Sequence, residues 1–178
     1  MKGLVFKEFI NMVEEKFGYE TVDEIIEDSQ LASKGAYTSV GTYNHEEIIT
    51  LVQSLSKKTK IPVPDLVKEF GRSLMPVFAK GFPDFFKEPN SFKFLGSLND
   101  YIHVEVKKLY PDAELPTFVT KSQSEKEMVL EYHSKRPLAD LAEGLIEALV
   151  KHYKEDIEIS TESPPGPPRS RTFTLKLK

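Results

Sequence analysis

The chain has 178 residues, no cysteine and a formal net charge of −4 at pH 7. Its 39% hydrophobic and 29% charged residues are typical of one ordinary globular domain, and the missing thiol excludes disulfides, iron–sulfur clusters and cysteine-ligated zinc. The negative charge argues against nucleic-acid binding, and no apolar run reaches the roughly 18 residues of a membrane span. We therefore expect a cytoplasmic protein that binds neither nucleic acid nor a membrane.

Hydrophobic residues at helical spacing predict four helices in the first half of the chain. Gly18 follows the first pattern in the position of a helix C-terminal glycine, and Thr21–Glu24 reads as a capping box. Pro76 falls inside the last pattern and predicts a kink or a break there. The predicted helices are residues 5–17, a helix opening at 21–24, a helix capped by Asn44 with Glu47 in its capping box, and a helix opening at Pro62 and Pro64 that extends to Phe78.

A further helix, which we expect Asn90 or Ser91 to cap and Pro111 to end, carries His103 beside its apolar face. That face is formed by Leu95, Leu98, Ile102, Val106 and Leu109. On periodicity alone, a histidine in this place is usually half-buried and bonded to a backbone carbonyl. Neutral imidazole is also a common metal ligand and the usual proximal ligand of haem iron, so both interpretations stand at this point.

After residue 116 the hydrophobic period changes from helical spacing to alternation, which predicts strands. Pro137 predicts the first turn of one more helix, which runs to Val150. Short turns between most of the strands favour an antiparallel sheet, so the predicted fold class is α+β. The predicted strands are residues 117–121, 128–132, 157–159 and 173–177.

Tyr132, Ser134 and Arg136 place a phenol, a hydroxyl and a guanidinium at alternate positions. In an extended segment alternate side chains share one face, so the three can converge on one target. All three donate hydrogen bonds, and the arginine fork suits a carboxylate. We call these three residues the clamp. An ordinary polar strand end would look similar. A haem, however, needs an axial ligand and hydrogen-bond donors for its two propionates, and a histidine helix combined with such a clamp supplies both.

These features together resemble the haem–nitric oxide/oxygen binding (H-NOX) family, which includes the haem domain of soluble guanylate cyclase. The matching segments are Met1–Gly3, the Tyr-x-Ser-x-Arg motif of the clamp, His103 followed by Leu109–Pro111, and Pro116–Phe118. The resemblance covers essentially the whole chain. It implies a single domain, residues 1–178, in which a helical N-terminal part of about residues 1–60 packs on helices and a four-stranded antiparallel sheet, with haem b between them.

The resemblance also implies roles for individual residues. His103 would be the proximal iron ligand, and the clamp would hold the propionates. Pro116 would pack against the porphyrin and help to distort it, although on physics alone it simply ends a loop. Asn99, one turn before the histidine, is a candidate partner for its second ring nitrogen.

Ligand choice depends on the distal side of the haem. In family members that hold dioxygen, a tyrosine lies five residues beyond the arginine of the clamp; here that position is Leu141. The other pocket positions implied by the resemblance are all apolar and would serve equally well as core: Val5, Phe9, Leu74, Phe78 and Leu145. Without a hydrogen-bond donor the haem should bind nitric oxide and carbon monoxide but hold dioxygen poorly, which predicts a nitric oxide sensor.

By the same resemblance, stand-alone bacterial members regulate a separate histidine kinase or diguanylate cyclase. Nitric oxide would weaken the bond from iron to His103, and the partner would respond to the resulting shift. We expect no enzyme, because peroxide cleavage requires a distal acid–base group. The alternatives are an O2-binding or NO-consuming haem protein, and an interaction module without haem. The spacing of the four histidines does not support a non-haem metal site.

Overall fold

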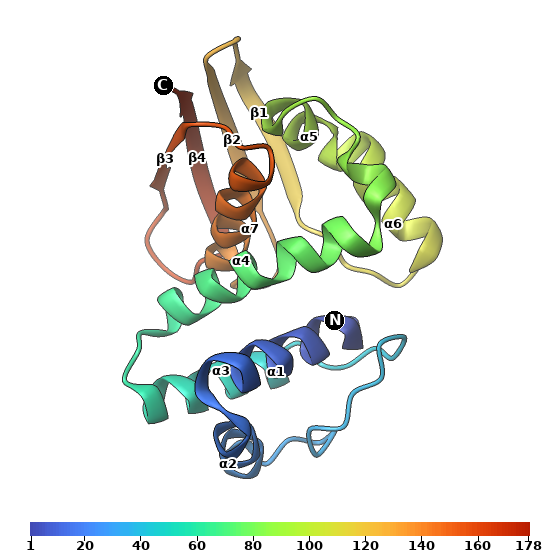
Figure 1. Ribbon diagram of the computed structural model, residues 1–178, viewed down its shortest axis with the longest axis vertical. Coiled ribbons are helices and arrows are strands. Elements are labelled where there is room, and N and C mark those ends of the chain that lie inside the picture. The colour runs from blue at the N-terminus through green and yellow to red at the C-terminus, as the bar shows by residue number, and fades with distance from the viewer.

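The computed structural model describes all residues from Met1 to Lys178 and divides into a helical half and a half built on a sheet (Figure 1). The sheet is antiparallel throughout, with strand order β1-β2-β4-β3. The predicted α+β class and the four-stranded antiparallel sheet are therefore confirmed. The elements are α1 (Gly3–Phe17), α2 (Tyr19–Ser29), α3 (Glu46–Thr59), α4 (Val63–Gly81), a 3₁₀ turn η1 (Pro83–Phe86), α5 (Ser91–Ser97), a π-helical turn η2 (Leu98–Ile102), α6 (His103–Leu109), β1 (Thr117–Gln123), β2 (Glu127–His133), α7 (Ala139–His152), β3 (Ile157–Glu162) and β4 (Ser170–Leu177).

The capping box predicted at Thr21–Glu24 is wrong. Helix α2 already begins at Tyr19, directly after Gly18, so Thr21 lies inside the first turn. Its hydroxyl donates to the carbonyl of Phe17 at 2.9 Å and does not cap a helix N-terminus. Gly18 has a positive φ of 86°, which a side chain would strain, and it is the single residue that separates α1 from α2.

The start of α3 follows the prediction in part. The N-cap of α3 is His45, one residue later than predicted, but the Asn44 side chain still accepts a hydrogen bond from the backbone N–H of Glu46 at 3.1 Å, as a capping residue does. The Glu47 carboxylate does not complete a capping box, because it accepts hydrogen bonds from the hydroxyls of Tyr37, at 2.7 Å, and Ser33. These bonds attach the loop between α2 and α3 to the helix that follows it.

The structure tests the predicted roles of two prolines. Pro76 lies inside α4, which continues to Gly81, so of the predicted kink or break the break does not occur and the kink stays a prediction. Pro137 precedes α7 by two positions, since the helix begins at Ala139 with Leu138 as its N-terminal cap, and it is not the first helical residue. No helix of the structure is both long and apolar enough to cross a membrane.

Helix α4 belongs to both hydrophobic cores. Leu74 packs in the core of the helical half, whereas the adjacent Met75 packs in the core between the sheet and α7. Helices α4 and α7 cross at two glycines without room for side chains. A Cβ atom on Gly71 would lie 2.4 Å from the carbonyl oxygen of Leu141, and one on Gly144 would lie 1.9 Å from that of Lys68. The two halves therefore meet along α4 and its crossing with α7.

Candidate functional site

A cavity of about 340 Å³ is lined by residues of both the helical half and the sheet half. Of the 33 residues that line it, 25 are hydrophobic, and its size is in the ordinary range of pockets for organic ligands, about 300–1,000 Å³. Its walls come from the start of α1, from α4, from the segment α5–η2–α6, from the loop after α6, from the adjoining ends of β1 and β2, and from α7. Such a lining suits a large apolar ligand with few polar groups.

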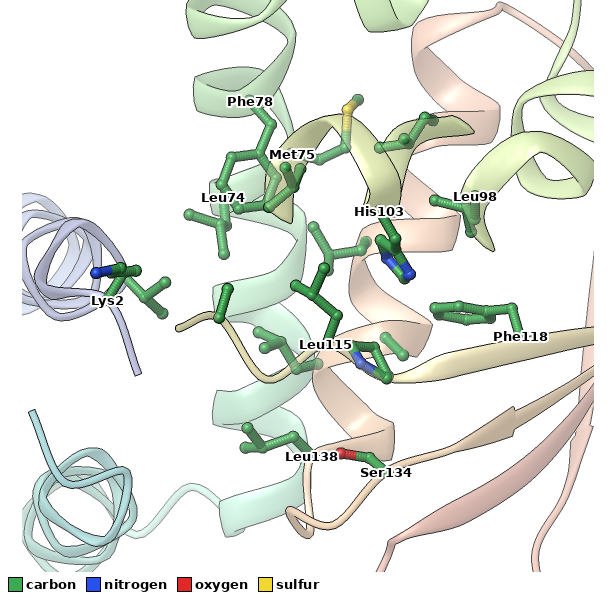
Figure 2. Close-up of a pocket in the computed structure, with 18 of the residues that line it drawn as sticks. Lys2, Leu74, Met75, Phe78, Leu98, His103, Leu115, Phe118, Ser134 and Leu138 are labelled. Carbon is green, nitrogen blue, oxygen red and sulfur yellow. The ribbon is translucent and has the colours of Figure 1, made fainter. Parts of the chain in front are cut away.

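His103 is the first residue of α6, and its ring projects into the cavity (Figure 2). Burial, with a smaller contribution from Lys107, lowers the pKa of His103 from 6.5 to about 4. The imidazole is therefore neutral at physiological pH, which is the form that binds a metal. Its ring centroid lies 6.1 Å from that of Phe118, which lines the same wall. The structure thus holds an uncharged imidazole in an apolar setting.

Asn99, which the sequence offered as a partner for His103, is engaged elsewhere. Its side-chain amide donates to the backbone carbonyl of Phe118, and its oxygen accepts from the backbone N–H of Phe118 at 3.1 Å. Asn99 lies in η2, the π-helical turn that leads directly into His103. Through these two hydrogen bonds the π-turn connects the base of the histidine helix to β1. Hydrophobic periodicity could not reveal this connection.

Tyr132 and Ser134 reach the cavity from the end of β2. Tyr132 is only 3% exposed, and burial raises the pKa of its phenol, which therefore stays protonated and able to donate. The strand ends at His133, so the extended segment predicted through Arg136 is too long. The chain bends instead, and the backbone N–H of Arg136 donates to the Ser134 hydroxyl at 3.0 Å. All three clamp residues nevertheless line the cavity.

Arg136 is paired with Glu114 in the loop before β1. Its Nη2 atom lies 3.0 Å from the Glu114 carboxylate, and Nη1 donates to the backbone carbonyl of the same residue at 3.2 Å. The guanidinium Nε is buried and has no hydrogen-bond partner. A buried N–H without an acceptor is costly. Together with the hydroxyls of Tyr132 and Ser134, this free donor fits a ligand that ends in carboxylates.

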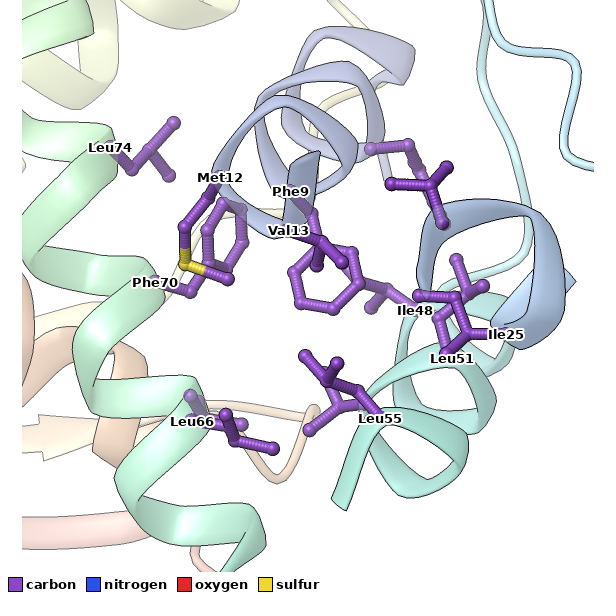
Figure 3. Packing of buried hydrophobic residues seen from close by; sticks show 14 of the residues in the cluster. Phe9, Met12, Val13, Ile25, Ile48, Leu51, Leu55, Leu66, Phe70 and Leu74 are labelled. Carbon is purple, nitrogen blue, oxygen red and sulfur yellow. The ribbon is translucent and has the colours of Figure 1, made fainter. Parts of the chain in front are cut away.

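The other predicted pocket residues divide into two groups. Phe9 does not line the cavity: it is fully buried in the helical core, where its ring meets that of Phe70 edge to face at 5.3 Å (Figure 3). The remaining ones all line the cavity: Val5, Leu74, Phe78, Pro116, Leu141 and Leu145.

Sequence reasoning missed several lining residues. Among them, Leu115 and Phe118 flank Pro116, and Met75 and Phe82 come from α4 and its end. Their only sequence signal is that they neighbour predicted positions. Lys2 and Asp112 also line the cavity, and nothing in the sequence pattern joins them.

The cofactor that these residues fit is a haem. No group of three or more histidine, aspartate or glutamate side chains lies close enough to hold a bare metal ion, whereas a haem needs a single protein ligand on its proximal side. The cavity offers one neutral histidine, apolar walls for a porphyrin and hydrogen-bond donors for carboxylates. The fit therefore rests on the type and placement of the lining residues.

Comparisons with known proteins agree with this interpretation. A family model described as Haem-NO-binding matches residues 2–161, and no curated protein matches the chain. The Fe(II) unliganded H-NOX protein from K. algicida is 36% identical, with a TM-score of 0.96 over 100% of this chain and 97% of that one. The S. oneidensis H-NOX protein in the Fe(II)NO state is 27% identical, with a TM-score of 0.90 over 100% and 99%. The H-NOX protein from Shewanella woodyi, solved with IWP-051 bound in the Fe(II)CO state, is 39% identical, with a TM-score of 0.83 over 100% and 95%.

Proposed function

Because the chain belongs to the Haem-NO-binding (H-NOX) family of haem-binding gas-sensor domains, we propose that it detects nitric oxide and does not retain dioxygen. The cofactor in this proposal is haem b, with the helical part of about residues 1–60 on its distal side. The observation that carries the proposal is the apolar wall formed by α4 and α7. Every residue that these two helices contribute to the cavity is hydrophobic: Leu74, Met75, Phe78, Leu141, Ala142, Leu145, Ile146 and Leu149.

His103 is the proposed axial ligand, because it is the one histidine that lines the cavity. Bound haem would supply a ferrous iron with a free position for a diatomic gas. The clamp would hold the propionates through the hydroxyls of Tyr132 and Ser134 and the guanidinium of Arg136, whose Nε has no partner within the protein. Charge-assisted hydrogen bonds of this kind contribute about 1.5–3 kcal/mol each. Pro116, at the end of the same loop as Glu114, would pack against the porphyrin.

The proposed selectivity follows from the apolar wall formed by α4 and α7. Dioxygen bound to ferrous iron gains negative charge and is stabilised by a hydrogen-bond donor, whereas bound nitric oxide gains much less from one. Leu141 stands where dioxygen-holding family members have a tyrosine, and it lines the cavity with no polar residue of α4 or α7 beside it. The same wall offers no acid–base group for peroxide chemistry, so the proposed role is sensing without catalysis.

A change in the position of His103 can reach the rest of the protein through η2 and β1. The side chain of Asn99 bonds both backbone groups of Phe118, so these two bonds connect the base of the histidine helix to the edge of the sheet. A separate histidine kinase or diguanylate cyclase that prefers one of the two arrangements would then be regulated by the gas.

The test of the ligand assignment is the visible spectrum of His103→Ala. We expect the variant to lose haem during purification and to regain a ferrous Soret band when imidazole is added, because free imidazole can replace the missing side chain. The matched control is His133→Ala, since His133 is exposed at the end of β2 and bonds Ser170. A His103→Ala protein that keeps its haem and its spectrum without imidazole would refute the assignment.

A further inference from the structure

A polar cluster lies at the edge of the cavity that the haem-binding role leaves unused. The Lys2 ammonium lies 2.9 Å from the Asp112 carboxylate and donates to the Thr42 hydroxyl at 2.8 Å. The Thr42 hydroxyl in turn donates to Asp112 at 2.8 Å. The Lys2 nitrogen also lies 5.4 Å from the centroid of the Tyr110 ring, within the range of a cation–π contact. We call these four residues the clasp; all of them line the cavity.

The clasp joins segments that are far apart in the sequence. Lys2 directly precedes α1 and pairs with Thr42 through an isolated β-bridge, so both belong to the helical half. Tyr110 and Asp112 lie in the loop that leads from the His103 helix to β1. Figure 2 places Lys2 across the cavity from His103. The clasp is therefore a polar connection between the helical half and the segment that carries the histidine.

Two backbone hydrogen bonds keep the Lys2 end of the clasp in place. The N–H of Gly3 donates to the carbonyl of Gly41 at 2.8 Å, and the N–H of Tyr43 donates to the carbonyl of Met1 at 2.9 Å. Gly3 also packs so tightly that a Cβ atom would lie 1.9 Å from the carbonyl oxygen of Thr38. Lys2 is thus presented to Asp112 by a fixed backbone and not by a free terminus.

The chemistry of the clasp makes it sensitive to salt. The Lys2 side chain is 18% exposed and that of Asp112 is 52% exposed, so counter-ions can reach the pair. Hydrogen bonds from Lys2 and Thr42 lower the pKa of Asp112 to about 2. The carboxylate therefore stays charged at every pH at which the protein is handled, and ionic strength is the variable that weakens the pair.

We propose that the clasp closes the cavity between the two halves, so that its opening sets the rate at which haem leaves and enters. The halves cannot separate easily at the crossing of α4 and α7, where backbone packs on backbone at Gly71 and Gly144. A ligand that fills the cavity must instead escape where side chains alone hold the halves together. The inference rests on the haem-binding role proposed above.

The experiment measures the transfer of ferric haem from the loaded protein to excess apomyoglobin. Lys2→Met and Asp112→Asn should each lose haem about threefold to tenfold faster than the wild type, as expected for losing an ion pair with its hydrogen bonds. The double variant should be no faster than either single variant, because both remove the same interaction. The exchanged pair Lys2→Glu with Asp112→Lys should restore part of the slow rate.

The matched control is Lys108→Met, which breaks the Lys108–Glu105 ion pair on α6 at a position outside the cavity lining. Raising the salt to about 0.5 M should bring the wild-type rate close to that of Lys2→Met and leave the variant rate almost unchanged. Equal rates in all proteins, or a control as fast as Lys2→Met, would overturn the proposal. The salt dependence of the wild-type rate tests the proposal even if a variant fails to fold.

A second readout separates this inference from the proposed function. Hydrogen exchange in the haem-free protein follows the amides of Tyr43 and Ala113, which are bonded to the carbonyls of Met1 and Tyr110. If the clasp joins the halves, Lys2→Met should raise exchange in both segments together, and Lys108→Met should raise it in neither. A wild type that takes up no haem would refute both the haem-binding role and the proposal that the clasp controls haem exchange. The hydrogen-exchange data would still show whether the clasp connects the two halves.

Discussion

Asn99 holds Phe118 by both of its backbone groups, across nineteen positions of the sequence. The two bonds close a loop that contains the whole of α6 and the segment 110–116. His103, Pro116 and Phe118 therefore belong to one closed unit, and all three line the cavity. This side chain therefore links the helical turn before the proposed iron ligand to the strand that follows the proline.

Replacing Asn99 by alanine should destabilise the haem-free protein by about 1–3 kcal/mol, because two partly buried backbone groups lose their partner. Urea denaturation followed by circular dichroism measures the change. Asn11→Ala is the matched control, since Asn11 is exposed and makes one long hydrogen bond to Glu8, at 3.4 Å. Equal midpoints for the two variants would show that the Asn99 bonds contribute nothing to the fold.

Gly144→Ala should destabilise the protein by about 1–3 kcal/mol through overpacking at the α4–α7 crossing, although alanine is intrinsically the better helix former by about 1 kcal/mol. The new Cβ would lie 1.9 Å from the backbone oxygen of Lys68, which cannot rotate away. Gly96→Ala in α5 is the control, because its nearest neighbour is 3.7 Å away. Thermal unfolding should show a lower midpoint for the first variant only; a rise in both would mean that α4 moves aside freely.

A buried ionic network lies next to the clamp on the sheet. Arg171 is the cross-strand partner of Tyr132, and its guanidinium binds Asp140 at 2.8 Å and also Glu143, which in turn binds Lys68 of α4. The Arg171 side chain is only 11% exposed. The network links β4, α7 and α4 close to the glycine crossing.

Arg171→Met should destabilise the protein by about 3 kcal/mol or more, because two buried carboxylates lose their main counter-charge. Lys176→Met on the same strand is the control: it breaks the exposed pair with Glu127 and should cost less than about 1 kcal/mol. Urea denaturation at neutral pH compares the two. A cost below that of the control would show that the buried network is not a source of stability.

The lowered pKa of His103 predicts a pH dependence of the haem-free protein. Between about pH 4, the folded value, and pH 6.5, the ordinary one, the unfolded chain binds a proton that the folded chain does not. The free energy of unfolding should therefore rise with pH in this window, by up to about 1.4 kcal/mol per pH unit from this group. The slope should fall by this amount in His103→Gln. Parallel curves for both proteins would contradict the burial of a neutral imidazole.

The local features of the site were predictable from the sequence. The periodicity around His103 and the alternation that ends in Tyr132 indicate most of the side chains that face inward, because helices and strands repeat at fixed periods, although Leu109, the last residue of the predicted apolar face, is 57% exposed. The structure places both residues on the cavity. The bend after His133 was not predictable in the same way, since it depends on a hydroxyl of Ser134 that accepts from the Arg136 backbone.

The long-range features could not be predicted, because no periodicity links the residues involved. Lys2 and Asp112 are 110 positions apart, and Asn99 resembles any polar residue on a helix until β1 is placed beside it. Phe9 is a different case. The family resemblance implied it as a pocket residue, whereas in the structure it packs against Phe70 in the core of the helical half.

The most direct test of the account is the absorption spectrum of the haem-loaded, reduced protein, recorded without oxygen, then in air, then with nitric oxide. The account predicts a five-coordinate ferrous spectrum that air leaves unchanged on the time scale of the recording and that nitric oxide shifts at once. The apolar wall around Leu141 gives bound dioxygen no hydrogen bond. A stable dioxygen complex in air would contradict the account, because it would require a donor that the α4–α7 wall does not contain and that Lys2 and Thr42, which are bonded to Asp112 in the clasp, do not supply.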